Sequence, residues 1–98
     1  MSNKKDKLRL LRKKVVSNKN NSKKLEEFLV KFADLASGEK LFQLCLSLVK
    51  THAEIAICYI ARSANESKNA KVWLEKRKKN NLYIQEMMEV WMLDYKGV

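Results

Sequence analysis

The sequence predicts a small all-α protein built from four helices. It contains no proline and only two glycines in 98 residues, whereas β-sandwich and α/β domains use both residues in their many turns. Apolar residues recur at helical spacing along stretches that are rich in Lys, Leu and Glu. Hydrophobic residues make up 46% of the chain and charged residues 33%, which is typical of a folded globular domain. The predicted helices span about residues 3–16, 23–36, 39–62 and 67–95, and the others pack around the apolar third helix.

Charge and spacing divide the chain into a basic N-terminal arm with its linker, residues 1–22, and a single helical domain, residues 23–98. In the arm, Leu8, Leu11 and Val15 form one stripe of a weakly amphipathic helix, and Lys and Arg fill most of its remaining surface. A helix so short and so charged is marginal unless this stripe docks. The arm is therefore expected either to become helical on a partner or to act as a solubilising tail.

Residues 23–36 form the most regular amphipathic pattern of the chain. Ser37 and Gly38 are predicted to end this helix, with Gly38 in the left-handed conformation that glycine adopts easily. The short connection predicts that the helix folds back on the next one as an αα-hairpin. Its apolar positions are Leu25, Phe28, Leu29, Phe32, Leu35 and Ala36.

Residues 41–60 contain the densest apolar run, and on a helix they would be apolar over more than half of the circumference. The narrow polar strip keeps its phase from Gln43 to Glu54, which favours one continuous helix over residues 39–62. A capping-box pattern that begins at Thr51 leaves open a break at that point. The segment is not expected to cross a membrane, because each charge near the middle of a bilayer costs about 2.5–3.5 kcal/mol.

The last predicted helix, residues 67–95, follows a turn over residues 61–69. Asn80 and Asn81 interrupt it without shifting its apolar phase, so a kink or a short break there is an open alternative. Its second half carries a second apolar face, which predicts either a homodimer interface or a deeper position in the monomer core. The predicted interface residues are Tyr83, Met87, Val90, Trp91 and Leu93.

Residue types that support catalysis or metal binding are sparse. Cys45, Cys58 and the single histidine, His52, do not converge on a helical wheel, so no metal site and no cofactor are expected. The cysteines are expected to be reduced, buried thiols, and His52 to be a core or interface residue that donates to a hydrogen-bond acceptor. No phosphate-binding glycine loop, nucleophile elbow or HExxH motif occurs, which predicts a protein that is not an enzyme. Without a signal-peptide pattern, an intracellular location, cytoplasmic or nuclear, is expected.

The net charge of +10 is concentrated in two blocks. Residues 1–24 contain ten Lys or Arg and one acidic residue. Residues 68–79 contain six Lys or Arg and one acidic residue. Such blocks neutralise phosphates and release counterions, which predicts nucleic-acid binding. The chain has 17 Lys and four Arg, and lysine contacts the backbone as a point charge rather than reading base edges. Few aromatic residues accompany the blocks, which disfavours single strands and favours a duplex or a structured RNA as the target. RNA is expected slightly over DNA. The predicted binding residues are Lys4, Lys5, Lys7, Arg9, Arg12, Lys13, Lys14, Lys19, Lys23, Lys24, Lys68, Lys71, Lys76, Arg77, Lys78 and Lys79.

Three other functions fit the same pattern less closely. The chain could be a protein–protein interaction or assembly subunit in which residues 82–95 dock a partner and the basic arm contacts an acidic protein. The arm could also bind a membrane surface, although residues 3–16 lack the Trp or Phe that interfacial helices usually carry. A calmodulin-type target helix is the weakest of these alternatives.

Overall fold

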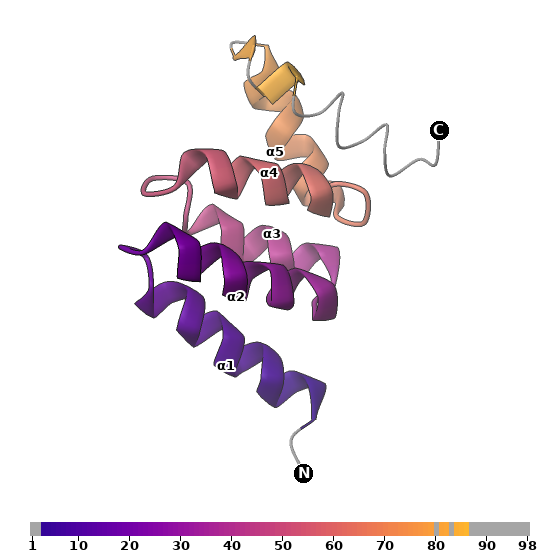
Figure 1. Ribbon diagram of the computed structural model, residues 1–98. Helices are drawn as coiled ribbons and strands as arrows, with labels where there is room; N and C mark the ends of the chain where they lie inside the picture. Colours follow the sequence, from indigo (N-terminus) through magenta and orange to yellow (C-terminus); the bar gives the residue numbers. More distant parts are fainter. Residues whose placement is uncertain (1–2, 80, 83, 87–98) are drawn as a thin grey trace.

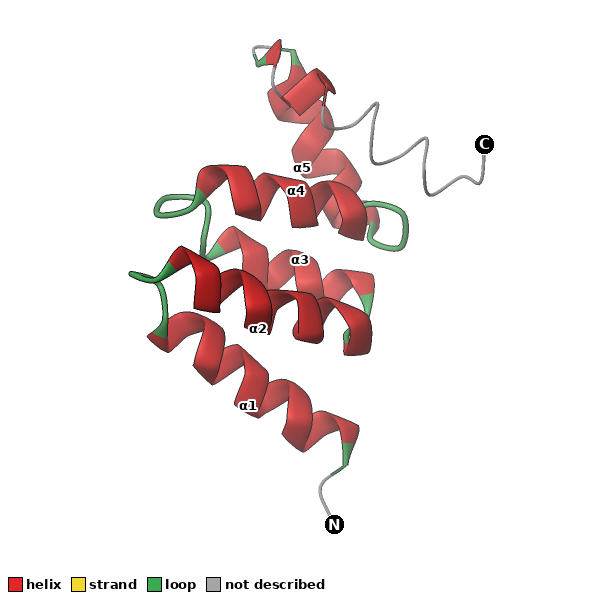
Figure 2. Ribbon diagram, in the orientation of Figure 1, coloured by secondary structure: helices red, strands yellow, loops and turns green. Residues whose placement is uncertain are grey.

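The computed structural model describes residues 3–79, 81, 82 and 84–86, and this part of the chain contains helices and turns but no strand. Figure 2 shows this all-helical composition. Residues 82 and 84–86 are also helical. The five longer helices are α1 (Lys4–Ser17), α2 (Ser22–Leu35), α3 (Gly38–Leu46), α4 (Ala53–Ser63) and α5 (Lys68–Lys78).

The helices stack in sequence order from one end of the molecule to the other (Figure 1). Helices α1 and α2 form one antiparallel hairpin, α3 and α4 form a second hairpin beside it, and α5 extends from the far side of α4. The principal extents are 43 × 29 × 20 Å. The basic N-terminal helix therefore lies at one end of the stack and α5 lies at the other.

Helix α1 begins after Asn3, whose side-chain oxygen accepts a hydrogen bond from the backbone N–H of Asp6 at 2.9 Å. The predicted apolar stripe is the side that packs on α2: Leu8 and Val15 are buried, and Leu11 is partly buried against the same core. The amphipathic helix predicted for residues 3–16 is thus confirmed. Its stripe is docked within the chain itself, which supplies the packing that so short a helix needs.

The connection between α2 and α3 corrects the predicted role of Gly38. This residue does not end α2 in a left-handed conformation; it is the first residue of α3, and Ser37 caps that helix by accepting from the N–H of Lys40 at 3.3 Å. A Cβ atom at Gly38 would lie 2.6 Å from Cβ of Glu66 and 2.9 Å from the carbonyl oxygen of Ser63. Glycine is required here because α3 approaches the turn after α4 closely.

The single helix predicted for residues 39–62 is two helices, α3 and α4, joined by a turn over residues 47–52. The carbonyl oxygen of Leu48 accepts from the N–H groups of Thr51 at 3.2 Å and His52 at 2.8 Å, which closes this turn. The open alternative placed the break correctly near Thr51. The cap is different, however: His52 is the N-cap residue of α4, and its side chain makes no capping hydrogen bond.

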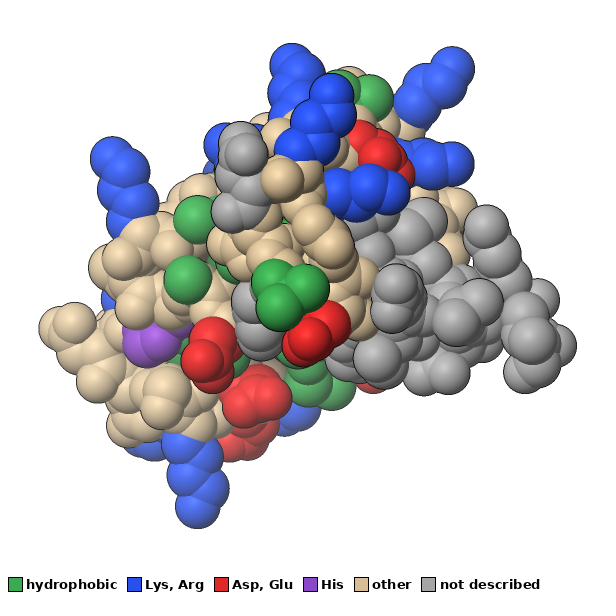
Figure 3. Space-filling view, turned by 90° about the horizontal axis from the view of Figure 1, so that it is seen from above, with side chains coloured by type: hydrophobic (Ala, Val, Ile, Leu, Met, Phe, Trp, Pro, Cys, Tyr) green, Lys and Arg blue, Asp and Glu red, His purple; other side chains and the backbone are tan. Residues whose placement is uncertain are grey.

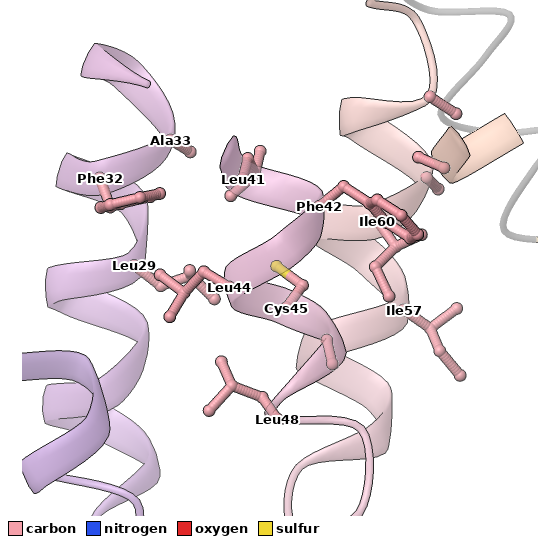
Figure 4. Close-up of a cluster of buried hydrophobic side chains, with 14 of the residues drawn as sticks. Leu29, Phe32, Ala33, Leu41, Phe42, Leu44, Cys45, Leu48, Ile57 and Ile60 are labelled. Atoms are coloured by element: carbon pink, nitrogen blue, oxygen red, sulfur yellow. The ribbon is translucent and has the colours of Figure 1, made fainter. Parts of the chain in front are cut away.

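The break has a physical reason in the width of the apolar surface. One continuous helix over residues 39–62 would be about 36 Å long, and a chain of this size has too few other helices to cover all of its sides. When the segment folds back, α3 and α4 cover each other. Figure 4 shows Leu29 of α2 pointing toward Leu44 of α3, and Phe42 of α3 pointing toward Ile60 of α4.

Polar contacts tie the two hairpins together. The ring Nε2–H of His52 donates to the carbonyl oxygen of Lys19, which joins the α3–α4 turn to the α1–α2 turn. His52 therefore makes the structural contact to an acceptor that the sequence predicts for it. Arg62 of α4 and Asp34 of α2 form an ion pair with an N–O distance of 3.2 Å.

Glu39 joins the start of α3 to the start of α5. Its carboxylate accepts hydrogen bonds from the Ser67 hydroxyl at 2.6 Å, from the Gln43 amide at 2.9 Å and from the Asn69 amide at 3.2 Å. These donors, Ser67 first, stabilise the charged form and lower the pKa of Glu39 below its ordinary value. Ser67 also caps α5 by accepting from the N–H of Ala70 at 3.1 Å, so one hydroxyl connects both helix starts.

Helix α5 ends at Lys78, well before the predicted end of the helix over residues 67–95. The side-chain oxygen of Asn81 accepts from the N–H of Ile84 at 3.2 Å, as the cap of a new helical segment does. An interruption between Lys78 and Asn81, which the sequence left open, is thus present. Leu74 is fully buried and Ile84 nearly so. The predicted interface residues Tyr83, Met87, Val90, Trp91 and Leu93 lie outside the described residues.

Replacing Gly38 with Ala tests the close approach of α3 to the α4–α5 turn. In an unobstructed helix this change stabilises by roughly 0.8–1 kcal/mol. We expect Gly38→Ala instead to destabilise the protein, by about 1–3 kcal/mol, because the added methyl group meets the backbone oxygen of Ser63 at 2.9 Å. Urea unfolding measures the change. An increase in stability would contradict the close approach.

Replacing Glu39 tests the junction between α3 and α5, because the free energy of unfolding should then depend less on pH. Because the folded-state pKa is lowered, the carboxylate stabilises the fold above its ordinary pKa of 4.5, and this contribution disappears as pH falls through the folded value. Unfolding free energies should therefore fall more steeply between pH 7 and pH 3 in the wild type than in Glu39→Gln. The variant Asn69→Ala, which removes one donor, should show an intermediate dependence. Identical pH profiles for all three proteins would contradict this role.

Candidate nucleic-acid interface

The predicted basic residues of the first block lie on the surface of α1 and at the start of α2. Because Leu8, Leu11 and Val15 face α2, the cationic side chains of α1 project from its other sides. Lys19, in the following turn, is half-buried, and the remaining members of the block are exposed. We call this the α1 surface; its residues are Lys4, Lys5, Lys7, Arg9, Arg12, Lys13, Lys14, Lys19, Lys23 and Lys24.

The second block lies on α5 and is more engaged with its own helix. Lys78 forms an ion pair with Glu75 at 3.2 Å, and the Arg77 guanidinium lies over the Trp73 ring, 3.8 Å from its centroid. Figure 3 views the molecule from this end and shows Lys and Arg side chains gathered on one part of the face. We call this the α5 surface; its residues are Lys68, Lys71, Lys76, Arg77, Lys78 and Lys79.

The fold does not bring the two surfaces together. Helix α1 and helix α5 lie at opposite ends of the stack, with α2, α3 and α4 between them (Figure 1). Each predicted block is therefore a separate surface. A ligand that follows one of them does not reach the other on the same molecule unless it also spans the intervening helices.

A hollow of about 360 Å³ lies where the α1 surface meets α2 and α3. Helix α1 contributes three cations to its rim, and the start of α3 contributes a fourth, Lys40. Lys40 and its neighbour Gln43 are absent from the predicted site, because they belong to the nearly neutral part of the sequence and approach α1 only through the tertiary fold. The lining residues are Lys5, Leu8, Arg9, Arg12, Phe32, Glu39, Lys40 and Gln43.

A second hollow, of about 510 Å³, follows a single face of α5. Its side chains recur every three or four residues, so they come from one helix and from no other described element. Val72, which is 48% exposed, adds an apolar side chain among the lysines. The lining residues are Lys68, Lys71, Val72, Glu75, Lys76 and Lys79.

The four arginines of the chain differ in what they contact. Arg62 is paired with Asp34, and Arg77 lies on Trp73. Within the described part of the chain, the ion pairs are Arg62–Asp34 and Lys78–Glu75, so neither Arg9 nor Arg12 has a carboxylate partner there. These two guanidinium groups present their donors to solvent on the α1 surface.

The cysteines differ in their environment. Cys45 is fully buried in the core, and this burial raises the pKa of its thiol to about 12. Cys58 is half-buried, so the prediction of two buried thiols holds for Cys45 alone. Among the described residues, no group of three His, Cys, Asp or Glu side chains is placed to hold a metal ion. No described helix is long and apolar enough to span a membrane.

Comparison with protein-family models finds no matching family, and comparisons with curated proteins and with solved structures find no significant match. The function is therefore inferred from the arrangement of the residues themselves.

The burial of Cys45 predicts an unreactive thiol. A Cys58→Ser variant leaves Cys45 as the single cysteine, and we expect it to react with a thiol reagent at pH 8 only when the protein unfolds, because reaction needs a solvent-accessible thiolate. Labelling with and without denaturant, followed by mass spectrometry, measures this difference. Rapid labelling of the native variant would show that Cys45 is not enclosed by the core.

Proposed function

We propose that the protein is a non-enzymatic nucleic-acid-binding protein that contacts the phosphate backbone with little sequence specificity and favours duplex or structured RNA over DNA. The observation that supports this proposal most directly is the α1 surface. Its helix is docked through an apolar stripe, so its cations are held on a defined scaffold and remain exposed. A helix of this kind presents charge to a polyanion without first having to fold.

The dimensions of α1 suit a phosphate backbone. From Lys4 to Lys14 the helix spans about 15 Å, which corresponds to roughly four steps along one strand of a duplex. Lysine and arginine along this length can neutralise several phosphates at once and release their counterions. The affinity for RNA should consequently fall steeply as salt rises.

The position of the aromatic side chains supports a duplex target over a single strand. Base stacking needs exposed rings. In the described part of the chain, Phe32 and Phe42 are buried, and Phe28, Tyr59 and Trp73 are half-buried. Phe28 lies beneath Lys14 and Lys31, and Trp73 lies beneath Arg77. These rings are occupied by cations of the protein, so contacts to backbone and shape remain the main source of binding.

A second candidate function is a protein-interaction or assembly role, with a second copy of the chain as the simplest partner. Leu82, just after α5, is 69% exposed, and Val72 on α5 is 48% exposed. Leu82 is the first residue of the segment whose apolar pattern predicts an interface, and an exposed apolar side chain gains stability when a partner covers it. A homodimer through residues 82–95 would cover Leu82. In that case Leu82→Glu should convert a dimer into a monomer in sedimentation measurements.

The nucleic-acid proposal is tested by fluorescence anisotropy with duplex RNA, duplex DNA and single-stranded RNA over a series of salt concentrations. We expect the affinity for duplex RNA to fall steeply as salt rises. In a plot of the logarithm of the binding constant against the logarithm of the salt concentration, the slope should be about minus one for each phosphate neutralised. The triple variant Arg9→Gln, Arg12→Gln, Lys13→Gln should flatten that slope and weaken binding to all sequences alike.

The matched control removes three cations from the other end of the molecule. The variant Lys68→Gln, Lys71→Gln, Lys76→Gln changes the net charge by the same amount on the α5 surface. Because the two surfaces are far apart, the effects of the two triple variants should add in free energy when they are combined. Absence of binding at low salt, or binding that does not change with salt, would overturn the proposal.

A further inference from the structure

We infer that the hollow between α1 and α3 is the phosphate-binding position of the α1 surface, with Lys40 of α3 acting together with Lys5, Arg9 and Arg12. This inference rests on the proposed function and identifies where on the protein the backbone phosphate is held. It differs from the sequence-based prediction, because that prediction assigns binding to the basic arm and contains no residue of α3. The ligand chemistry is a phosphodiester of the RNA backbone.

The first support is that the hollow is built by packed elements. Lys5, Arg9 and Arg12 recur at intervals of four and three residues, so they share one side of α1. Beneath them, Leu8 of α1 is 7% exposed and Phe32 of α2 is 3% exposed. This packing fixes α1 against α2, and the cations of the rim are thereby held near α3.

The second support is the charge balance of the rim. Four cations and one carboxylate, Glu39, line the hollow. Glu39 accepts hydrogen bonds from Ser67 and Asn69 on its α5 side and from Gln43, which also lines the hollow. None of the four cations forms an ion pair with any residue in the described part of the chain. The rim therefore keeps an excess of positive charge that a phosphate would neutralise.

The third support is the presence of arginine. Guanidinium groups bind phosphate through two parallel N–H donors, which fixes the position of the anion as well as attracting it. Of the four arginines in the chain, Arg9 and Arg12 lie at this hollow, whereas Arg62 and Arg77 are engaged elsewhere. The two side chains that suit phosphate best thus line the same hollow as Lys40.

The hollow on α5 is a weaker choice. Its described lining comes from α5 and the residue that follows it, so among the described residues no second element fixes the positions of its lysines. Glu75 lies among them and is paired with Lys78 at 3.2 Å. A lysine of α5 can attract phosphate, but the described part of the chain places no second helix there to hold the anion between two sets of donors.

Lys40 provides a sharp test, because it lies outside both basic blocks of the sequence. We compare Lys40→Gln with Lys50→Gln, which makes the same change of charge at another exposed lysine, in the turn after α3 and outside the hollow. With the duplex RNA used above, we expect Lys40→Gln to weaken binding by about threefold to tenfold and to lower the salt slope by about one. Lys50→Gln should leave Kd within about twofold of the wild type. Lys50 follows the end of α3, whereas Lys40 is near its start, so salt screens the charge of Lys50 from a phosphate in the hollow.

A second substitution separates charge from packing. Lys40→Arg keeps the positive charge and should restore at least wild-type affinity. The backbone N–H of Lys40 still donates to Ser37 in every variant, so the helix cap is retained, and unfolding curves check the fold.

If Lys40→Gln and Lys50→Gln bind alike while the α1 triple variant is weakened, the inference is overturned and the proposed function stands. If Lys40→Arg fails to restore a loss seen in Lys40→Gln, positive charge is not the cause and the inference is likewise overturned. If the wild-type protein does not bind RNA in a salt-dependent manner, the proposed function itself fails.

Discussion

The apolar surface of residues 41–60 is wider than the rest of this short chain can cover, and the remainder of the structure depends on how it is buried. The chain folds back over residues 47–52, so that α3 and α4 each cover part of the other. The fold-back also sets the start of α3 beside the end of α4 and the start of α5. Three consecutive residues there have three roles: Gly38 permits the close approach, Glu39 bonds to Ser67, and Lys40 lies at the hollow beside α1.

Stability and charge are separated in space. The core is formed by apolar side chains from every helix, and several polar contacts around it lie at helix starts and turns, where backbone groups need partners. The cations gather on the two outermost helices, where water solvates them. This arrangement lets a strongly basic protein fold without placing like charges inside it. It also divides the positive surface into two parts at opposite ends of the stack.

The charge pattern of the sequence predicts part of the candidate site, and the rest depends on the tertiary structure. The basic blocks identify the helices that would contact a polyanion, and the structure finds most of these residues exposed, as binding requires. The pattern does not show that the blocks lie at opposite ends of the molecule. It also gives no indication of Lys40, which is one of several isolated lysines in a nearly neutral segment and becomes distinctive only because it lines the same hollow as Arg9 and Arg12.

The sequence by itself determined the all-α class and the apolar stripe of Leu8, Leu11 and Val15, because helical periodicity is a local property. It left open whether this stripe docks within the chain and whether the helix is interrupted near Asn81, and the structure decided both. Tertiary structure alone decided the division of residues 39–62. A polar strip that stays in phase fits both a continuous helix and two helices joined by a turn, and the choice depends on how much apolar surface other elements can cover. The role of Gly38 was likewise decided by tertiary structure. Its neighbours in sequence suggest a helix end, whereas its neighbours in space, Ser63 and Glu66, make the absence of a side chain necessary.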